Sequence, residues 1–131
     1  MNRRPARRKQ VDRAFARARC ERARGFLDAA RVIDARPEAD ANACVSNAVL
    51  AGIAAGDAIC AAALGEISAS QNHADAADLL ATVDRDLGRK LASLIGLKAQ
   101  SQYGAELISA ANRRVAVRYA AVLVEAAVAR V

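Results

Sequence analysis

Residues 45–65, VSNAVLAGIAAGDAICAAALG, form the longest run of small and apolar side chains in the sequence, and Asp57 is the only charged residue in it. The larger apolar side chains recur at helical spacing against a background of Ala and Gly. This pattern predicts a helix that neighbouring helices can approach closely. The run also reaches the roughly 20 residues needed to span a membrane. We interpret it as a buried core helix and expect no membrane span, because Ala and Gly favour insertion weakly and a mid-span Asp57 would cost about 2.5–3.5 kcal/mol.

The composition of the chain favours helix almost throughout. The 131 residues include only two Pro and seven Gly, and aromatic residues make up 3%. Strand signals, meaning alternating β-branched or aromatic runs bounded by turns, are not visible. We therefore predict an all-α fold in a single domain. Its expected architecture is an antiparallel up-down bundle of four main helices plus one short extra helix.

Helix-breaking and capping residues set the expected boundaries of these helices. Pro37 ends the first helix, Gly65 is placed as the C-cap of the second, Ser70 or Asn72 can cap the short helix, and Ser109 can cap the last one. The expected helices span residues 10–35, 38 or 41 to 64, 73–83, 84–98 and 110–130, with an irregular connection over residues 100–107.

Positive charge is concentrated at the start of the chain. The first 24 residues hold ten Arg or Lys and two acidic residues, a net +8, whereas the other 107 residues hold ten basic and twelve acidic ones, a net −2. We expect residues 1–9 to form a disordered basic arm and residues 10–131 to form the helical bundle. A solvated helix end with i,i+4 ion pairs explains the same charges. The alternative is contact with the phosphates of RNA or DNA, for which the candidates are Arg3, Arg4, Arg7, Arg8, Lys9, Arg13 and Arg17.

Residues able to do chemistry are few and isolated. Cys20, Cys44 and Cys60 have no metal-ligand spacing and His73 is the only histidine, so we predict neither a metal site nor another cofactor. No secretory signal is recognisable, and a reducing cytoplasm suits the unpaired cysteines. Asp57 is either a carboxylate with a perturbed pKa or, as we favour, the partner of an Arg or Lys on a neighbouring helix. The candidate catalytic residues are Asp57, His73, Lys98 and Tyr103.

Four phrases of the sequence together resemble the HEPN domain superfamily, in particular its small stand-alone actinobacterial members. They are AVLAGIAAGDAICAAALG, HADAADLL, LIGLKAQSQYGAELIS and the closing AAVLVEAAVARV, and the resemblance covers about residues 11–131. It implies an antiparallel helical bundle that forms a homodimer. It also implies a role in a bacterial toxin–antitoxin or defence module, with a cognate toxin, antitoxin or nucleotidyltransferase as partner.

The ribonuclease motif of active HEPN toxins is missing from this chain. That motif is an Arg followed after four to six residues by a His, whereas Glu66, Ile67 and Ser68 stand at the corresponding distances before His73. Without it, no evident imidazole activates the RNA 2′-hydroxyl. We therefore expect a non-catalytic HEPN-like protein that binds a protein or RNA partner. The alternatives are a divergent, metal-independent ribonuclease and nucleic-acid binding through the Arg-rich N-terminal segment.

Overall fold

The computed structural model of the protein describes residues 7–36, 40–103 and 108–131, except for the side chains of residues 100–103. The expected all-α fold is confirmed. Five helices account for most of the described chain: α1 (Arg13–Asp34), α2 (Ala41–Leu64), α3 (His73–Val83), α4 (Arg85–Tyr103) and α5 (Ala110–Arg130).

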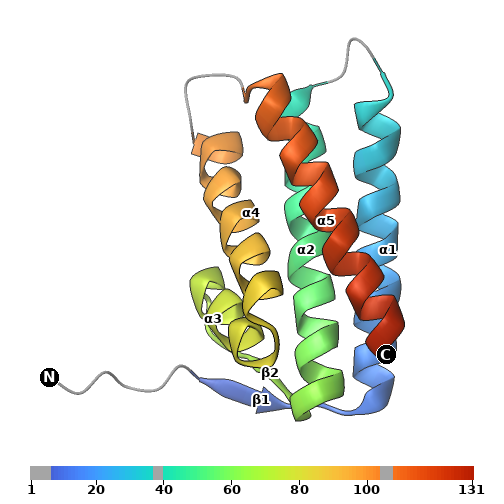
Figure 1. Ribbon diagram of the computed structural model, residues 1–131, viewed down its shortest axis with the longest axis vertical. Coiled ribbons are helices and arrows are strands. Elements are labelled where there is room, and N and C mark those ends of the chain that lie inside the picture. The colour runs from blue at the N-terminus through green and yellow to red at the C-terminus, as the bar shows by residue number, and fades with distance from the viewer. Residues whose placement is uncertain (1–6, 37–39, 104–107) are drawn as a thin grey trace, which may run out of the picture.

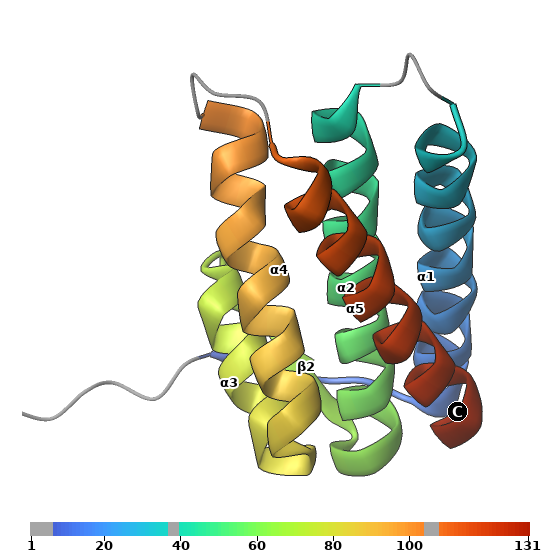
Figure 2. The same ribbon diagram turned by 45° about the horizontal axis from the view of Figure 1, so that its top comes forward.

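The four long helices run alternately up and down (Figure 1). Helices α1, α2 and α4 stand side by side, and α5 crosses obliquely in front of α2 so that its end lies over the lower part of α1 (Figures 1 and 2). The short α3 packs against α2 and α4 at one end of the bundle. This arrangement matches the predicted antiparallel bundle with one short extra helix.

Helix α2 is the centre of the bundle, in contact with all four other helices. Val45, Val49 and Ile59 are at most 1% exposed. The helix is long and apolar enough to cross a membrane, with a mean hydropathy of 1.7, yet 67% of that apolar stretch is buried inside the bundle. Burial against other helices is what the Ala- and Gly-rich composition predicts, because small side chains let helix axes come close.

Glycines allow the closest approaches between helices. A Cβ atom on Gly52 would lie 2.5 Å from Leu94 Cδ1, and one on Gly88 would lie 2.7 Å from the Cα of Ala81. The first contact brings α4 onto α2 and the second brings α4 onto α3. Gly65 has a different purpose, since its φ of 67° places it in the left-handed region that ends α2.

A small sheet at the base of the bundle was not predicted. Strand β1 (Arg8–Gln10) pairs antiparallel with β2 (Glu66–Ser68), and the Val11 amide donates to the Gly65 carbonyl at 2.9 Å. Arg8 and Lys9 therefore lie in a strand, not in the disordered arm that we expected over residues 1–9. Residues 1–6 of that arm lie outside the described part of the chain.

Capping side chains fix most helix ends where the sequence places them. Asn72 caps α3 by accepting from the Ala74 amide, and Ser109 caps α5 by accepting from the Asn112 amide. Two predicted boundaries are wrong. Helix α1 begins at Arg13 and not at Gln10, because Asp12 provides its N-cap, and α4 continues to Tyr103 through residues that we assigned to a connection.

Candidate functional site

The carboxylate of the central helix is partly buried and is paired with an arginine. Asp57 Oδ2 accepts a hydrogen bond from Arg19 Nη2 of α1 at 3.2 Å, and the two side chains are 17% and 28% exposed. Burial raises the pKa of Asp57, and the nearby Arg19 partly offsets that effect. The geometry agrees with the interpretation that we favoured, in which Asp57 joins α2 to its neighbour instead of facing a substrate.

His73 and Lys98 are the two candidate catalytic residues that the fold brings into each other's electrostatic range. His73 is the first residue of α3, and Lys98 lies on α4, which packs antiparallel to α3. Partial burial and then the charge of Lys98 lower the pKa of His73, so its imidazole is neutral at physiological pH. Tyr103 closes α4, and its side chain lies outside the described residues.

The three cysteines are all buried and free. The Cys44 thiol donates to the Ala30 carbonyl at 3.4 Å, which ties α2 to α1. Burial, followed by the charge of Asp57, raises the pKa of Cys60 to about 12, so this thiol stays protonated and unreactive. Over residues 7–36, 40–103 and 108–131, no group of three or more His, Cys, Asp or Glu side chains could hold a metal ion.

The basic residues predicted to contact nucleic acid do not form one surface. Arg3 and Arg4 lie outside the described residues. Arg7 and Arg8 line a hollow beside Asp75 and Asp78 of α3. In addition, Arg8 pairs with Glu66 at 3.4 Å, and Lys9 lines a separate hollow with Phe15.

Arg13 and Arg17 lie elsewhere, in a notch of about 130 Å³ at the base of the bundle. The other lining residues of this basal notch are Ala16 of α1, Ala62 of α2, Arg130 of α5 and Val131. Arg130 was not predicted as a site residue, because nothing local in the sequence shows that the end of α5 comes to the start of α1.

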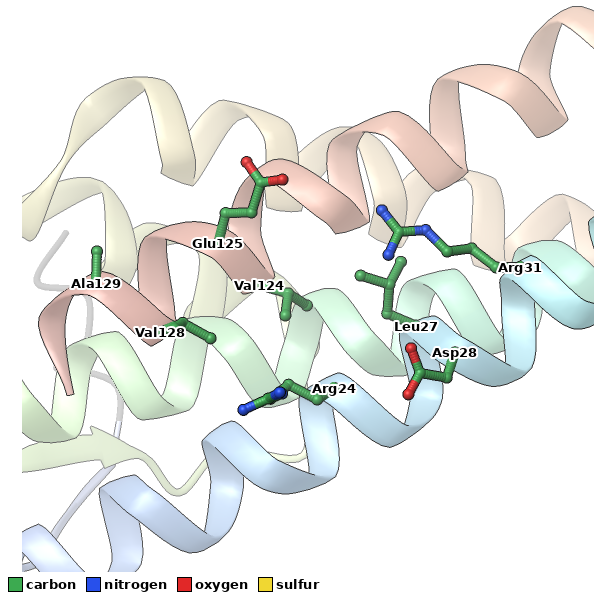
Figure 3. Close-up of a pocket in the computed structure, with 8 residues that line it drawn as sticks. All are labelled: Arg24, Leu27, Asp28, Arg31, Val124, Glu125, Val128 and Ala129. Atoms are coloured by element: carbon green, nitrogen blue, oxygen red, sulfur yellow. The ribbon is translucent and has the colours of Figure 1, made fainter.

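A groove of about 400 Å³ between α1 and α5 was not predicted either. Its floor is apolar, since Leu27 and Val124 are each 4% exposed. Val128 lines the same groove and is 50% exposed. Figure 3 shows the two walls, with Arg24, Leu27, Asp28 and Arg31 on α1 and Val124, Glu125, Val128 and Ala129 on α5.

The rim of this α1–α5 groove carries both signs of charge. Arg24 pairs with Glu21 on its own helix at 3.5 Å. Asp28, Arg31 and Glu125 form no ion pair with any described residue. The groove therefore combines an apolar floor with unpaired charges, which are the ingredients of a protein-binding surface. Val32 and Val128 are large apolar residues that are exposed on these two helices, but the pairing of α1 with α5 could not be read from the sequence.

Comparison with protein-family models, with curated proteins and with solved structures finds no match to this chain.

Proposed function

We propose that this protein is a non-catalytic helical binding protein of the HEPN type, and that it acts as a homodimer in a cytoplasmic bacterial toxin–antitoxin or defence module. The α1–α5 groove supports the homodimer. The HEPN type, the compartment and the module rest on the resemblance of the sequence phrases. The non-catalytic part of the proposal is supported by the Asp57–Arg19 pair, because the partly buried carboxylate is engaged by the neighbouring helix.

Charge complementarity argues for a second copy of the chain as the occupant of the groove. In a two-fold symmetric interface, the same patch faces itself, so each group must find its complement within the patch. The groove rim holds Arg24 and Arg31 together with Asp28 and Glu125, two bases and two acids. Val128 supplies apolar area on the α5 wall of the groove. Val32, which is 60% exposed and follows the groove residue Arg31 on α1, supplies more beside it.

Sedimentation equilibrium of the purified protein tests this proposal. We expect a dimer, and we expect Val128→Arg to weaken it by about 100-fold or more, since a charge placed in an apolar interface loses several kcal/mol. Leu64→Arg is the matched control, because Leu64 is also exposed, at 43%, but does not line the groove. A monomer at all concentrations, or equal effects of the two variants, would contradict the homodimer.

A charge exchange sharpens the same test. Arg31→Glu and Glu125→Arg should each weaken the dimer, because each leaves the rim with an excess of one sign. Combining them restores the balance and should recover most of the affinity. If the losses of affinity in the two single variants simply add in the double variant, Arg31 of one copy does not face Glu125 of the other copy in the dimer.

A divergent, metal-independent ribonuclease is the second candidate function. In its favour, the fold brings His73 into the electrostatic range of Lys98, so that a candidate general base lies near a cation. This function predicts RNA cleavage in the presence of EDTA that is lost in His73→Ala. Wild-type protein that leaves RNA intact, or cleavage that persists in the variant, would rule it out.

A further inference from the structure

Arginines from two different helices converge in the basal notch. Arg13 and Arg17 are one turn apart on α1, so their side chains leave the helix on the same side. Arg130 reaches the notch from the last turn of α5. Ala16 and Ala62 form a floor of small side chains that leaves the guanidinium groups accessible.

Neighbouring acids leave much of this charge uncompensated. Arg130 pairs with Asp84 at 3.2 Å, whereas neither Arg13 nor Arg17 forms an ion pair with a described carboxylate. Asp12 is the nearest acid in sequence, and its Oδ1 accepts the Phe15 amide as the cap of α1. The first turn of α1 contains no acidic residue. Arg13 and Arg17 are therefore two exposed cations near the positive end of a helix, and this arrangement favours binding of an anion.

We propose that the basal notch binds the phosphate backbone of a nucleic acid. Guanidinium groups bind phosphate oxygens in a bidentate fashion, and two adjacent arginines with a third across the notch suit consecutive phosphates. Nucleic acid is favoured over an isolated phosphate because Arg13 and Arg17 are one turn apart along α1 and Arg130 reaches the notch from α5, so the three cations suit successive phosphates of a backbone better than a single one. The interaction is with the backbone, so it is independent of base sequence. This site is separate from the α1–α5 groove and does not depend on the homodimer.

Fluorescence anisotropy with a labelled single-stranded RNA of mixed sequence tests the notch. We expect binding that weakens steeply with salt, and we expect the double variant Arg13→Gln/Arg17→Gln to lose about tenfold in affinity and roughly 1.4 in the slope of log K against log salt. Arg114→Gln/Arg118→Gln is the matched control. It removes two exposed arginines with the same spacing from the beginning of α5, and its affinity should change less than about twofold.

The substitution Asp84→Asn should change the affinity for RNA in the opposite direction. Asp84 Oδ1 accepts the Leu87 amide at the start of α4, and Asn can keep that capping bond. The substitution removes the carboxylate that holds Arg130, so the affinity for RNA should rise by several-fold. A variant that damaged the fold would not bind more tightly.

The remaining outcomes decide against the proposal. Absence of RNA binding by the wild type overturns it, as does an equal loss in the two double variants, which would indicate a response to net charge alone. Competition with inorganic phosphate at constant ionic strength distinguishes the two sources of phosphate. If phosphate alone binds as tightly as RNA and displaces it, the notch is a small-anion site and the nucleic-acid proposal is wrong.

Discussion

The central helix and the outer pair of helices differ in how completely the fold uses their side chains. On α2, Ile59 is fully buried and the one carboxylate, Asp57, is held by Arg19. On α1 and α5, Val32 and Val128 are at least half exposed, and Arg31 has no ion-pair partner among the described residues. The apolar run of α2, which is the most unusual stretch of the sequence, therefore serves to pack the core. The surfaces available to bind a partner lie on α1 and α5, whose sequences show no unusual pattern.

The largest test of this difference removes apolar side chains from each region. Ile59→Ala should lower the free energy of unfolding by about 2–5 kcal/mol, because it leaves a cavity where the side chain is fully buried. Val32→Ala, at a side chain that is 60% exposed, should change it by no more than about 0.5 kcal/mol. Urea denaturation of dilute protein measures both values. Similar losses at the two positions would remove the distinction between the regions.

Two arginines on α1 test the same difference through charge. Arg19→Leu leaves Asp57 without its partner and should cost about 2–3 kcal/mol of stability, somewhat less than for a fully buried pair. Arg17→Leu, two residues earlier on the exposed side, should be nearly neutral. Adding Asp57→Ala to Arg19→Leu should restore most of the loss. If the double variant stayed as unstable as Arg19→Leu, the pair would not be the cause.

Two glycines of α4 allow a comparison between a closely packed position, Gly88, and an open one, Gly96. Gly88→Ala places a Cβ atom against the backbone of Ala81 and should destabilise the protein by about 1–3 kcal/mol. Gly96→Ala meets nothing within 4 Å and should stabilise it by about 0.5–1 kcal/mol through helix propensity. Thermal unfolding should shift in opposite directions, and shifts of one sign would contradict the close contact between α3 and α4.

The smallest expected effect is the pH dependence contributed by Asp57. Burial raises its pKa above the ordinary value of 3.8, so the folded protein holds this proton more strongly than the unfolded chain does. The stability that protonated Asp57 contributes is present below pH 3.8 and is lost as the pH rises through the folded-state pKa. The stability of the wild type relative to Asp57→Asn should therefore fall over that window and then level off. A relative stability that rose with pH would mean that Arg19, not burial, dominates.

The sequence predicted much of the fold because helix ends depend on neighbouring residues. Gly65, Asn72 and Ser109 act on amides and carbonyls within one helical turn, so their capping roles were visible without tertiary information. The end of α4 was misplaced since Gly104 and the polar residues before it suggested a connection. The strand pair was missed because Arg8–Gln10 has no apolar alternation, and because its partner strand Glu66–Ser68 lies far away in the chain.

The candidate site was less predictable from the sequence. The pairing of Asp57 with an arginine was expected, but the sequence offered several arginines and packing selected Arg19. The basic residues were recognised as a group, and the fold then divided them between the sheet, the hollow beside Phe15 and the basal notch. Arg130 and the α1–α5 groove had no local signal at all. Both arise from the oblique course of α5 across the bundle (Figure 2).

By itself, the sequence determined that this chain is helical, where most of its helices begin and end, and which helix is buried. These properties follow from composition, capping and periodicity, which act over a few residues. Only the tertiary structure decided which charges are neutralised and which stay available. That outcome depends on contacts between residues far apart in the chain, such as Arg19 with Asp57 or Arg130 with Asp84, and the packing of whole helices sets those contacts.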